Sequence, residues 1–413
     1  MLDRKLEPYI RAYAHTVVRC GLNVITNRVV FIDADIDQPD FVRLLVKECY
    51  QQGARRVIVN WTYRPIQRMQ YDRTDIKELT TVYSYQVARF KFQADELTPR
   101  IIVESEDPDY LKGLDPAKIA ATQTMKSKVR KPFRKIMDKV ESPWVICTCP
   151  SVKWAKAVFP NCSEEVAVRK LWKAILDCCR ITYGDPVENW KNYNKHVKQK
   201  AKWLNDLDID TLHYTSKNGT DLVVGMTKAC HWCGGAHDSV GNPPFNPNMP
   251  AVETFTSPDK YRINGIVYSS KPLCHNGQLI DEFYFVIKKG KIIEVHAKKG
   301  EKLLKDLVYA TDTSCYLGEC ALVPYDSPVS NTGLIFYKTV FDENAACHFA
   351  LGYSLSTGYP YYRESPIRAL DKLGLNQGST HIDFMVGTKD LNITATTRKG
   401  KKVAIFRNGN WAE

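Results

Sequence analysis

The chain has 413 residues, of which 44% are hydrophobic and 25% are charged, and its formal net charge is +12 at pH 7. This composition is typical of a folded globular protein and excludes a disordered or fibrous one, while the length favours two domains. The longest apolar runs, such as "WVIC" and "FALGY", fall far short of the roughly 20 residues that cross a bilayer, so we expect no membrane protein.

The first half of the sequence alternates predicted helices and strands. Helical spacing of apolar residues occupies 8–21 and 39–53, and buried strands are predicted at 28–34 and 55–61. A strand, a helix and a second strand in this order form a βαβ unit, which builds a parallel sheet. The pattern continues with strands at 100–105 and 144–149 and with helices near 116–140, 164–180 and 187–206.

The loop after the first predicted strand excludes the common nucleotide-binding motifs. Its sequence, "DADIDQPD", offers neither G-x-G-x-x-G nor a P-loop. Farther along, Ser163 precedes an apolar periodic stretch and is expected to cap a helix.

From about residue 206 the sequence favours antiparallel strands. An Asn-Gly pair at 218–219 indicates a hairpin over 212–226. Further hairpins are predicted at 261–270 and 283–297, and single strands at 333–341, 381–387 and 403–411. We therefore predict an α/β chain with an N-terminal βαβ domain over 1–205, built on a parallel sheet, and a β-rich α+β catalytic domain over 206–413.

The cysteines and the basic clusters indicate compartment and partners. Thirteen cysteines at irregular spacing do not suit a disulfide framework, so we expect free thiols and a cytoplasmic protein, which agrees with an N-terminus that lacks an apolar signal segment. Basic residues cluster at 125–140, 191–203 and 288–307. We interpret the first two clusters mainly as solvated helix faces, which makes nucleic acid an unlikely partner; a nucleic-acid surface stays an alternative.

Five acidic and imidazole side chains of the second half point to a metal site. Residues two apart on a strand share a face, so His381 and Asp383 of "HIDFMVG" present an imidazole and a carboxylate to one point. Singly, each of the five is more often an ordinary hydrogen-bonded buried group. Together they suit one or two divalent zinc, cobalt or manganese ions. The set is Glu253, Glu319, His348, His381 and Asp383.

The surroundings of these residues add detail. Gly318 leaves room for close backbone approach beside Glu319, and His348 lies in a segment predicted to be a helix. Glu343 precedes that histidine and is a candidate general base. A pair of ions that share a carboxylate can acidify a water and polarise a carbonyl.

A second candidate site is weaker. Cys230 and Cys233 have C-x-x-C spacing, but no second C-x-x-C pair follows to complete a structural zinc site. Nucleophilic catalysis finds no support, because G-x-S-x-G is absent from the sequence.

Several ordered blocks carry a resemblance to a known family. "NPNMPAVETFTSP", "YLGECALVP", "DSPVSNTGLIFYKTVFDENAACHFALG" and "HIDFMVG" resemble the M29 family of metallo-aminopeptidases, the aminopeptidase T and aminopeptidase S group, and the similarity covers nearly the whole chain. The resemblance implies a homodimeric aminopeptidase with two metal ions per chain, peptide substrates and the same five ligands. Two positions depart from the family pattern: Val252 replaces a glutamate, and Leu355 replaces a tyrosine.

We therefore expect a metal-dependent aminopeptidase that removes N-terminal residues with two ions, a metal-activated water and Glu343 as base, its activity weakened by Val252 and Leu355. The main alternative is a catalytically impaired, metal-binding relative with a regulatory or binding role. An iron dioxygenase, which uses two histidines and one carboxylate, is a further alternative.

Overall fold

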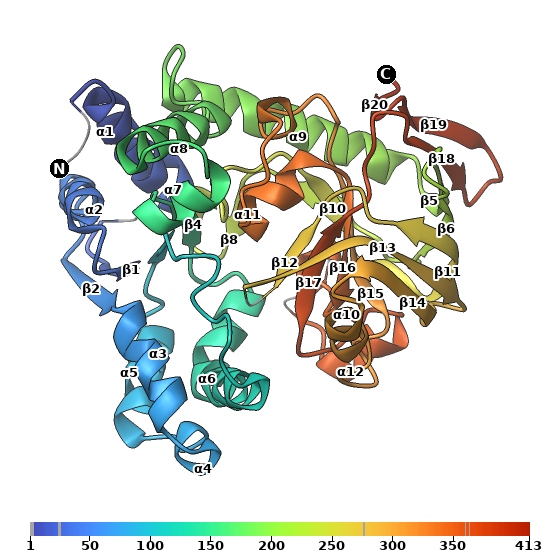
Figure 1. Ribbon diagram of the computed structural model, residues 1–413. Helices are drawn as coiled ribbons and strands as arrows, with labels where there is room; N and C mark the ends of the chain where they lie inside the picture. Colours follow the sequence, from blue (N-terminus) through green and yellow to red (C-terminus); the bar gives the residue numbers. More distant parts are fainter. Residues whose placement is uncertain (1–3, 24–25, 276, 360, 363) are drawn as a thin grey trace. The chain divides into compact units, whose positions relative to one another are not determined.

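The computed structural model describes residues 4–23, 26–275, 277–359, 361–362 and 364–413 (Figure 1). The chain divides into two compact units. Unit 1 comprises Met1–Lys191 and Ala236–Pro250, and unit 2 comprises Asn192–Gly235 and Ala251–Glu413. The division at Lys191 falls within helix α9, Pro186–Asp206. Separate domains that meet near residue 205 stay a prediction.

Unit 1 is built on a four-stranded parallel sheet, as the βαβ pattern predicts. Its order is β2-β1-β3-β4, and the three pairings are all parallel. The strands are β1 (Val29–Asp35), β2 (Arg56–Thr62), β3 (Arg100–Glu104) and β4 (Trp144–Thr148). β1 lies between β2 and β3, so the chain leaves β1 toward one edge of the sheet and later extends from β3 toward the other.

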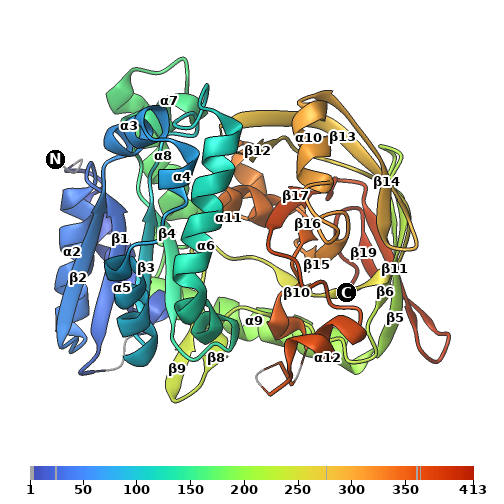
Figure 2. The ribbon, with the colours of Figure 1, turned by 90° about the horizontal axis from the view of Figure 1, so that it is seen from below.

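Helices connect the strands of this sheet and pack beside it (Figure 2). α6 runs alongside β3 and β4 in Figure 2, and the Arg100 guanidinium on β3 lies 5.7 Å from the centre of the Phe133 ring on α6. The side chain of Ser163 accepts a hydrogen bond from the Val166 N–H, which confirms the predicted cap. The helical segments are α1 (Glu7–Thr16), η1 (Val17–Leu22), α2 (Pro39–Gln51), α3 (Arg64–Arg73), α4 (Ile76–Leu79), α5 (Ser84–Asp95), α6 (Pro116–Asp138), α7 (Val152–Val158) and α8 (Glu164–Cys178).

The segment Ala236–Pro250 belongs to unit 1 although it follows strands of unit 2 in the sequence. It contains the hairpin of β8 (His237–Ser239) and β9 (Asn242–Phe245). The Phe245 ring packs on Trp144 of β4 with 4.9 Å between ring centres. This apolar contact explains why the segment joins the first unit.

Unit 2 contains a nine-stranded sheet in the order β12-β13-β11-β6-β5-β18-β19-β20, with β14 paired to β13. The hairpin of β5 (Ile209–Thr215) and β6 (Asp221–Met226) confirms the Asn-Gly turn, and Gly219 adopts a positive φ of 105° there. The other strands are β11 (Pro258–Tyr268), β12 (Leu273–His275), β13 (Gln278–Lys288), β14 (Lys291–Lys299), β18 (Asn392–Thr397), β19 (Lys402–Arg407) and β20 (Asn410–Trp411).

A five-stranded sheet in the order β17-β16-β15-β10-β7 completes the β structure of unit 2. The strands are β7 (Cys233–Gly234), β10 (Thr254–Thr256), β15 (Leu317–Leu322), β16 (His348–Gly352) and β17 (His381–Met385). Its apolar face packs against the nine-stranded sheet: Phe349 lies 5.2 Å from Tyr214 of β5, and Phe384 lies 5.1 Å from Phe285 of β13, between ring centres.

Short helical segments connect the strands of unit 2. Three predictions made from the sequence of this unit are wrong. Residues 261–270 belong to one long strand, β11, followed by a turn, and not to a hairpin. Residues 333–341 contain irregular chain and the start of α11 in place of a strand. The short helical segments of unit 2 are α10 (Glu301–Val308), η2 (Ser330–Thr332), α11 (Thr339–Asp342), η3 (Glu343–Ala345), η4 (Ser356–Gly358) and α12 (Ile367–Lys372).

The third correction concerns His348, which begins strand β16 and not a helix. β16 pairs with β15 on one side and with β17 on the other, and each of its residues is buried. A strand buried on both faces has a continuous apolar sequence, and its period does not distinguish it from a buried helix.

Replacement of Phe349 by alanine is expected to destabilise unit 2. The side chain is fully buried between the sheets, so the cavity lowers the free energy of unfolding by about 3–5 kcal/mol. Urea denaturation measures the change. The control Ile293→Ala removes a half-exposed side chain and is expected to change stability by no more than about 0.5 kcal/mol. Equal effects would contradict the packing described here.

Candidate metal centre

The polar face of the five-stranded sheet brings the predicted ligands together. On neighbouring strands, residues that are paired in register point to the same side. Ala350 of β16 pairs with Glu319 of β15 and with Asp383 of β17, while Gly352 pairs with His381. His348 lies two residues before Ala350 and shares its face. The face opposite Phe349 and Phe384 therefore carries four of the five residues.

Small residues leave space between these side chains. Ala350 stands between Glu319 and Asp383, where a larger side chain would fill the gap. Gly318 also allows a close backbone approach, as the sequence predicts, because a Cβ there would lie 2.2 Å from the carbonyl oxygen of Gly352. The fifth residue, Glu253, directly precedes β10, which pairs with β15.

The five side chains form two groups with metal-ligand geometry. One group is Glu253, Glu319 and His348, and the other is Glu319, His381 and Asp383; within each, one ligand atom per residue lies within 4.8 Å of the others. Glu319 belongs to both. The His348 Nε2 lies 3.1 Å from a Glu253 oxygen, and the His381 Nε2 lies 2.9 Å from a Glu319 oxygen.

In both His348 and His381, the ring nitrogen that faces away from the cluster forms a hydrogen bond to a backbone carbonyl. The Nδ1 of His348 lies 3.1 Å from the Ala346 carbonyl oxygen, and the Nδ1 of His381 lies 2.8 Å from that of Tyr353. A carbonyl only accepts, so Nδ1–H is the donor in each bond. Nε2 is then directed to the cluster, which is the arrangement that ligating histidines adopt.

The cluster concentrates negative charge in a buried place. Burial raises the pKa of Glu319, which the His381 charge offsets only in part. Burial alone lowers the pKa of His348, but the hydrogen bond and charge of Glu253 outweigh it and raise the pKa to about 9. For Asp383, burial acts to raise the pKa, but the charge and hydrogen bond of His381, together with the charge of His348, outweigh burial and lower it.

This donor set fits divalent metal ions. The buried Asp383 Oδ1 has the His381 Nε2 as an ion-pair neighbour at 3.2 Å and accepts no well-aligned hydrogen bond from the described residues. Buried charges are normally paired or bound to metal, and here carboxylates outnumber imidazoles. Carboxylate oxygen and imidazole nitrogen are ligands for zinc, cobalt and manganese.

Glu343 lies beside these groups on η3 and is buried. Burial raises its pKa well above the ordinary value, and the charges of Asp383 and Glu253 raise it further. The preceding Asp342 has a structural role, because its carboxylate accepts hydrogen bonds from the backbone N–H groups of Phe336 and Lys338 at 2.8 and 3.1 Å.

Sequence reasoning missed Asn344, which connects Glu343 to the ligand segment. Its Nδ2 donates to the Val340 carbonyl at 3.0 Å and to Glu343 Oε1 at 3.4 Å, while its Oδ1 accepts from the Val252 N–H at 2.6 Å. Asn344 is fully buried. The signal in the sequence is an amide directly after the candidate base, which is too common a pattern to identify the residue.

Valine and leucine occupy positions 252 and 355, so neither position carries a polar side chain. Val252 is buried and uses its N–H to hold Asn344. The carbonyl of Leu355 accepts a hydrogen bond from the Ser257 hydroxyl at 2.9 Å. Both residues thus retain backbone roles.

The C-x-x-C pair does not form a metal group within the described residues. The Cys230 Sγ lies 3.3 Å from the Thr256 hydroxyl, and the Cys233 Sγ lies 3.7 Å from the Phe255 carbonyl oxygen. Neither belongs to the two groups described above. The thirteen cysteines, all within the described residues, form no disulfide, as the sequence predicts.

Comparison with known proteins gives a consistent result. A model of the thermophilic metalloprotease family M29 matches residues 6–411. The chain belongs to the M29 family. It is therefore a metalloprotease, a hydrolase of peptide bonds that uses divalent metal.

Individual relatives support the same assignment. Aminopeptidase AmpS of Bacillus subtilis is 37% identical, and the alignment covers 98% of this chain and 98% of that protein. Aminopeptidase T of Thermus thermophilus is 33% identical, and the alignment covers 96% of this chain and 97% of that protein.

Two solved structures resemble this one. The structure of wild-type AmpT from Thermus thermophilus matches with a TM-score of 0.91 and 32% identity over 99% of this chain and 100% of that one, which confirms the α/β fold with its parallel and antiparallel sheets. A 2,5-dihydroxypyridine dioxygenase from Pseudomonas putida shares the fold alone, at a TM-score of 0.55 and 10% identity over 100% of this chain and 98% of that one. Within the described residues, no helix has the length and hydropathy of a membrane span.

Replacement of His381 by alanine is expected to abolish metal binding in the second group, because it removes the imidazole that lies between two carboxylates. Elemental analysis of dialysed protein measures the metal content per chain. The control His296→Ala removes an exposed imidazole and is expected to leave the content unchanged. A His381 variant with full metal content would contradict the assignment of this ligand.

Proposed function

We propose that the protein is an aminopeptidase that removes N-terminal residues from peptides with two divalent metal ions per chain. The observation that carries the proposal is the shared position of Glu319 in two adjacent metal-ligand groups. Two ions that share a carboxylate are typical of aminopeptidases. The aminopeptidase relatives, which match the chain along nearly its whole length, favour this activity over an impaired relative or a dioxygenase.

The proposed ligands are Glu253, Glu319, His348, His381 and Asp383, with zinc, cobalt or manganese as the metal. When bound, such ions acidify water and polarise a carbonyl. The residues of the chain supply the rest: the carboxylates attract the α-ammonium group of a peptide, and the buried setting strengthens each electrostatic contact.

Glu343 is the proposed general base. Within the described residues its hydrogen-bond partner is Asn344, whose Nδ2 lies 3.4 Å from Glu343 Oε1, and the other carboxylate oxygen is left to accept a proton. Asn344 positions this side chain, since its amide is fixed by two backbone groups. Val252 and Leu355 lack the polar groups of the family pattern, so we infer a lower turnover than a member with the glutamate and tyrosine would have.

The M29 membership also supports a homodimer, which the molar mass from light scattering tests. The free thiols support a cytoplasmic location. Fractionation of the source cells tests that location.

Metal-dependent hydrolysis of aminoacyl-p-nitroanilides is the expected activity. Protein stripped of metal is reloaded with cobalt, zinc or manganese and assayed beside its Glu319→Ala variant. We expect activity that requires metal and disappears in the variant, because Glu319 belongs to both ligand groups. Activity in the unmodified chain would also show that Val252 and Leu355 are compatible with catalysis. Metal-loaded protein that hydrolyses no substrate would contradict the proposed function.

Replacement of Glu343 by glutamine is expected to lower kcat by about 10²–10⁴-fold with unchanged metal content, because the amide keeps the shape but cannot accept a proton. KM is expected to change far less. The control Glu294→Gln alters an exposed carboxylate on β14. If kcat falls less than threefold while the fold is retained, Glu343 is not the base.

A further inference from the structure

Unit 1 contains a large pocket that the proposed peptidase chemistry does not use. Its volume is about 1390 Å³, which exceeds the roughly 300–1,000 Å³ typical of small-molecule sites. The pocket is lined by the chain segments that follow all four strands of the parallel sheet, including Asp37 after β1, Arg64 after β2, Glu106 after β3 and Ser151 after β4.

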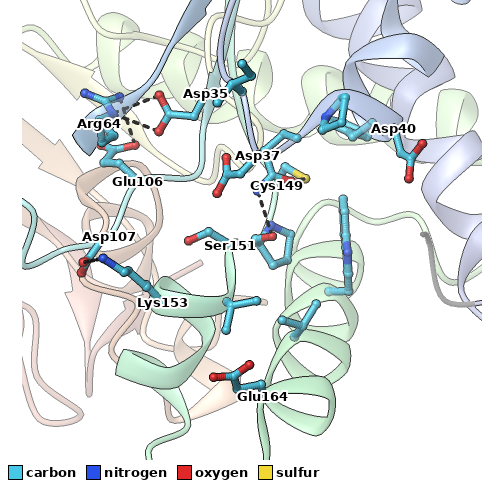
Figure 3. Close-up of a pocket in the computed structure, with 18 of the residues that line it drawn as sticks. Asp35, Asp37, Asp40, Arg64, Glu106, Asp107, Cys149, Ser151, Lys153 and Glu164 are labelled. Atoms are coloured by element: carbon cyan, nitrogen blue, oxygen red, sulfur yellow. Dashed lines mark hydrogen bonds and ion pairs between the residues drawn. The ribbon is translucent and has the colours of Figure 1, made fainter. Parts of the chain in front are cut away.

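This position is where open parallel sheets bind ligands. Ligands occupy the crevice outside the carboxyl ends of the strands, at the point where connections from neighbouring strands diverge. In the order β2-β1-β3-β4 that point lies between β1 and β3. The segments after these two strands, Asp35–Phe41 and Glu106–Tyr110, form adjacent parts of the pocket wall (Figure 3).

The two segments make this part of the pocket acidic in a chain of net charge +12. Neither contributes a cationic side chain to the lining. Their carboxylates are Asp35, Asp37, Asp40, Glu106, Asp107 and Asp109.

Neighbouring cations form ion pairs with five of these six carboxylates. The Arg64 Nε lies 2.9 Å from Asp35, and the Lys153 Nζ lies 3.4 Å from Asp107. Within the described part of the chain, Asp37 forms no ion pair. In Figure 3 its carboxylate points into the space between Glu106 and Ser151. Asp37 is partly exposed; the partial burial of its carboxylate raises the pKa, while a hydrogen bond with Gln38 and the charge of Arg64 lower it.

The walls also select against two common ligand classes. Six cationic side chains also line the pocket, but a phosphate group would face the carboxylates at the strand ends, without a glycine-rich loop to bind it. A metal ion needs ligands that converge, yet the groups with metal-ligand geometry in the described chain lie in unit 2. Apolar surface is present, because Phe41 and Trp172 line the pocket and their rings pack 5.6 Å apart.

We propose that this pocket binds an organic ammonium group, carried by a free amino acid or by the N-terminus of a short peptide, with Asp37 as its charge partner. The ammonium replaces the missing cation beside Asp37, and Ser151 and Glu106 offer further oxygen acceptors. The side chain of the ligand lies against the apolar part of the wall. The choice of α-ammonium compounds rests on the proposed function, which consumes and releases them.

Calorimetric titration tests the proposal in the Glu319→Gln background, where hydrolysis is not expected and the metal centre is impaired. The probes are leucine, the tripeptide Leu-Gly-Gly and N-acetylleucinamide, which lacks the ammonium. We expect at least one of the first two to bind and N-acetylleucinamide not to bind. Adding Asp37→Asn is expected to weaken binding at least tenfold. The matched control is Asp72→Asn, an exposed α3 carboxylate outside the lining.

The outcomes separate this site from the metal centre. Binding by the tripeptide alone identifies peptides as the ligand, and binding by leucine identifies the free amino acid. Equal affinity in the Asp37 and Asp72 variants, equal binding of the acetylated probe, or no binding of any probe would overturn the proposal. Binding that depends on Asp37 in a protein without peptidase activity would leave this proposal standing while the proposed function fails.

Discussion

The two faces of the five-stranded sheet in unit 2 are the constraint on which the site depends. Phe349 and Phe384 alternate with His348 and Asp383 along β16 and β17, so the contacts that bury the aromatic rings also fix the direction of the polar side chains. A slip of one residue in register would exchange these faces and place charges in the apolar core. The core therefore determines the site geometry: aromatic packing against the nine-stranded sheet holds the strands in the one register that brings the carboxylates and imidazoles together.

The same arrangement carries an electrostatic cost. Glu319 is almost completely buried with other carboxylates nearby, and an unpaired buried charge is strongly unfavourable. The sheet compensates in part, through imidazoles whose Nδ1–H groups bond to backbone carbonyls. In the absence of a cation the imidazoles themselves act as counter-charges, which is why the pKa of His348 rises. Divalent metal would take over that role, and Ala350 and Gly318 keep the space that the ligands need.

Sequence patterns predict the regular parts of this molecule well. The βαβ order predicts the parallel sheet, and the Asn-Gly pair predicts the hairpin of β5 and β6, because both are local signals. Period two correctly places His381 and Asp383 on one face. The nature of β16 escapes prediction, since this central strand is buried on both faces and is apolar apart from His348, so its sequence resembles that of a buried helix. The membership of Ala236–Pro250 in unit 1 depends on contacts such as Phe245 with Trp144, more than a hundred residues apart in the chain, and no local pattern encodes such a contact. The role of Asn344 likewise arises only from its neighbours in space.

Asn344 also explains how the chain accommodates valine at position 252. The contact at this position runs through the backbone: the Val252 N–H donates to the Asn344 amide oxygen, and the amide nitrogen donates to Glu343. A glutamate, as in the family pattern, would add a carboxylate to a cluster whose like charges already raise the pKa of Glu343. Valine removes one charge while it preserves the hydrogen bond that orders the segment before Glu253. With valine at position 252, the hydrogen bond to Asn344 still orders the ligand segment. The backbone contact at position 252 therefore does not depend on the side chain that stands there.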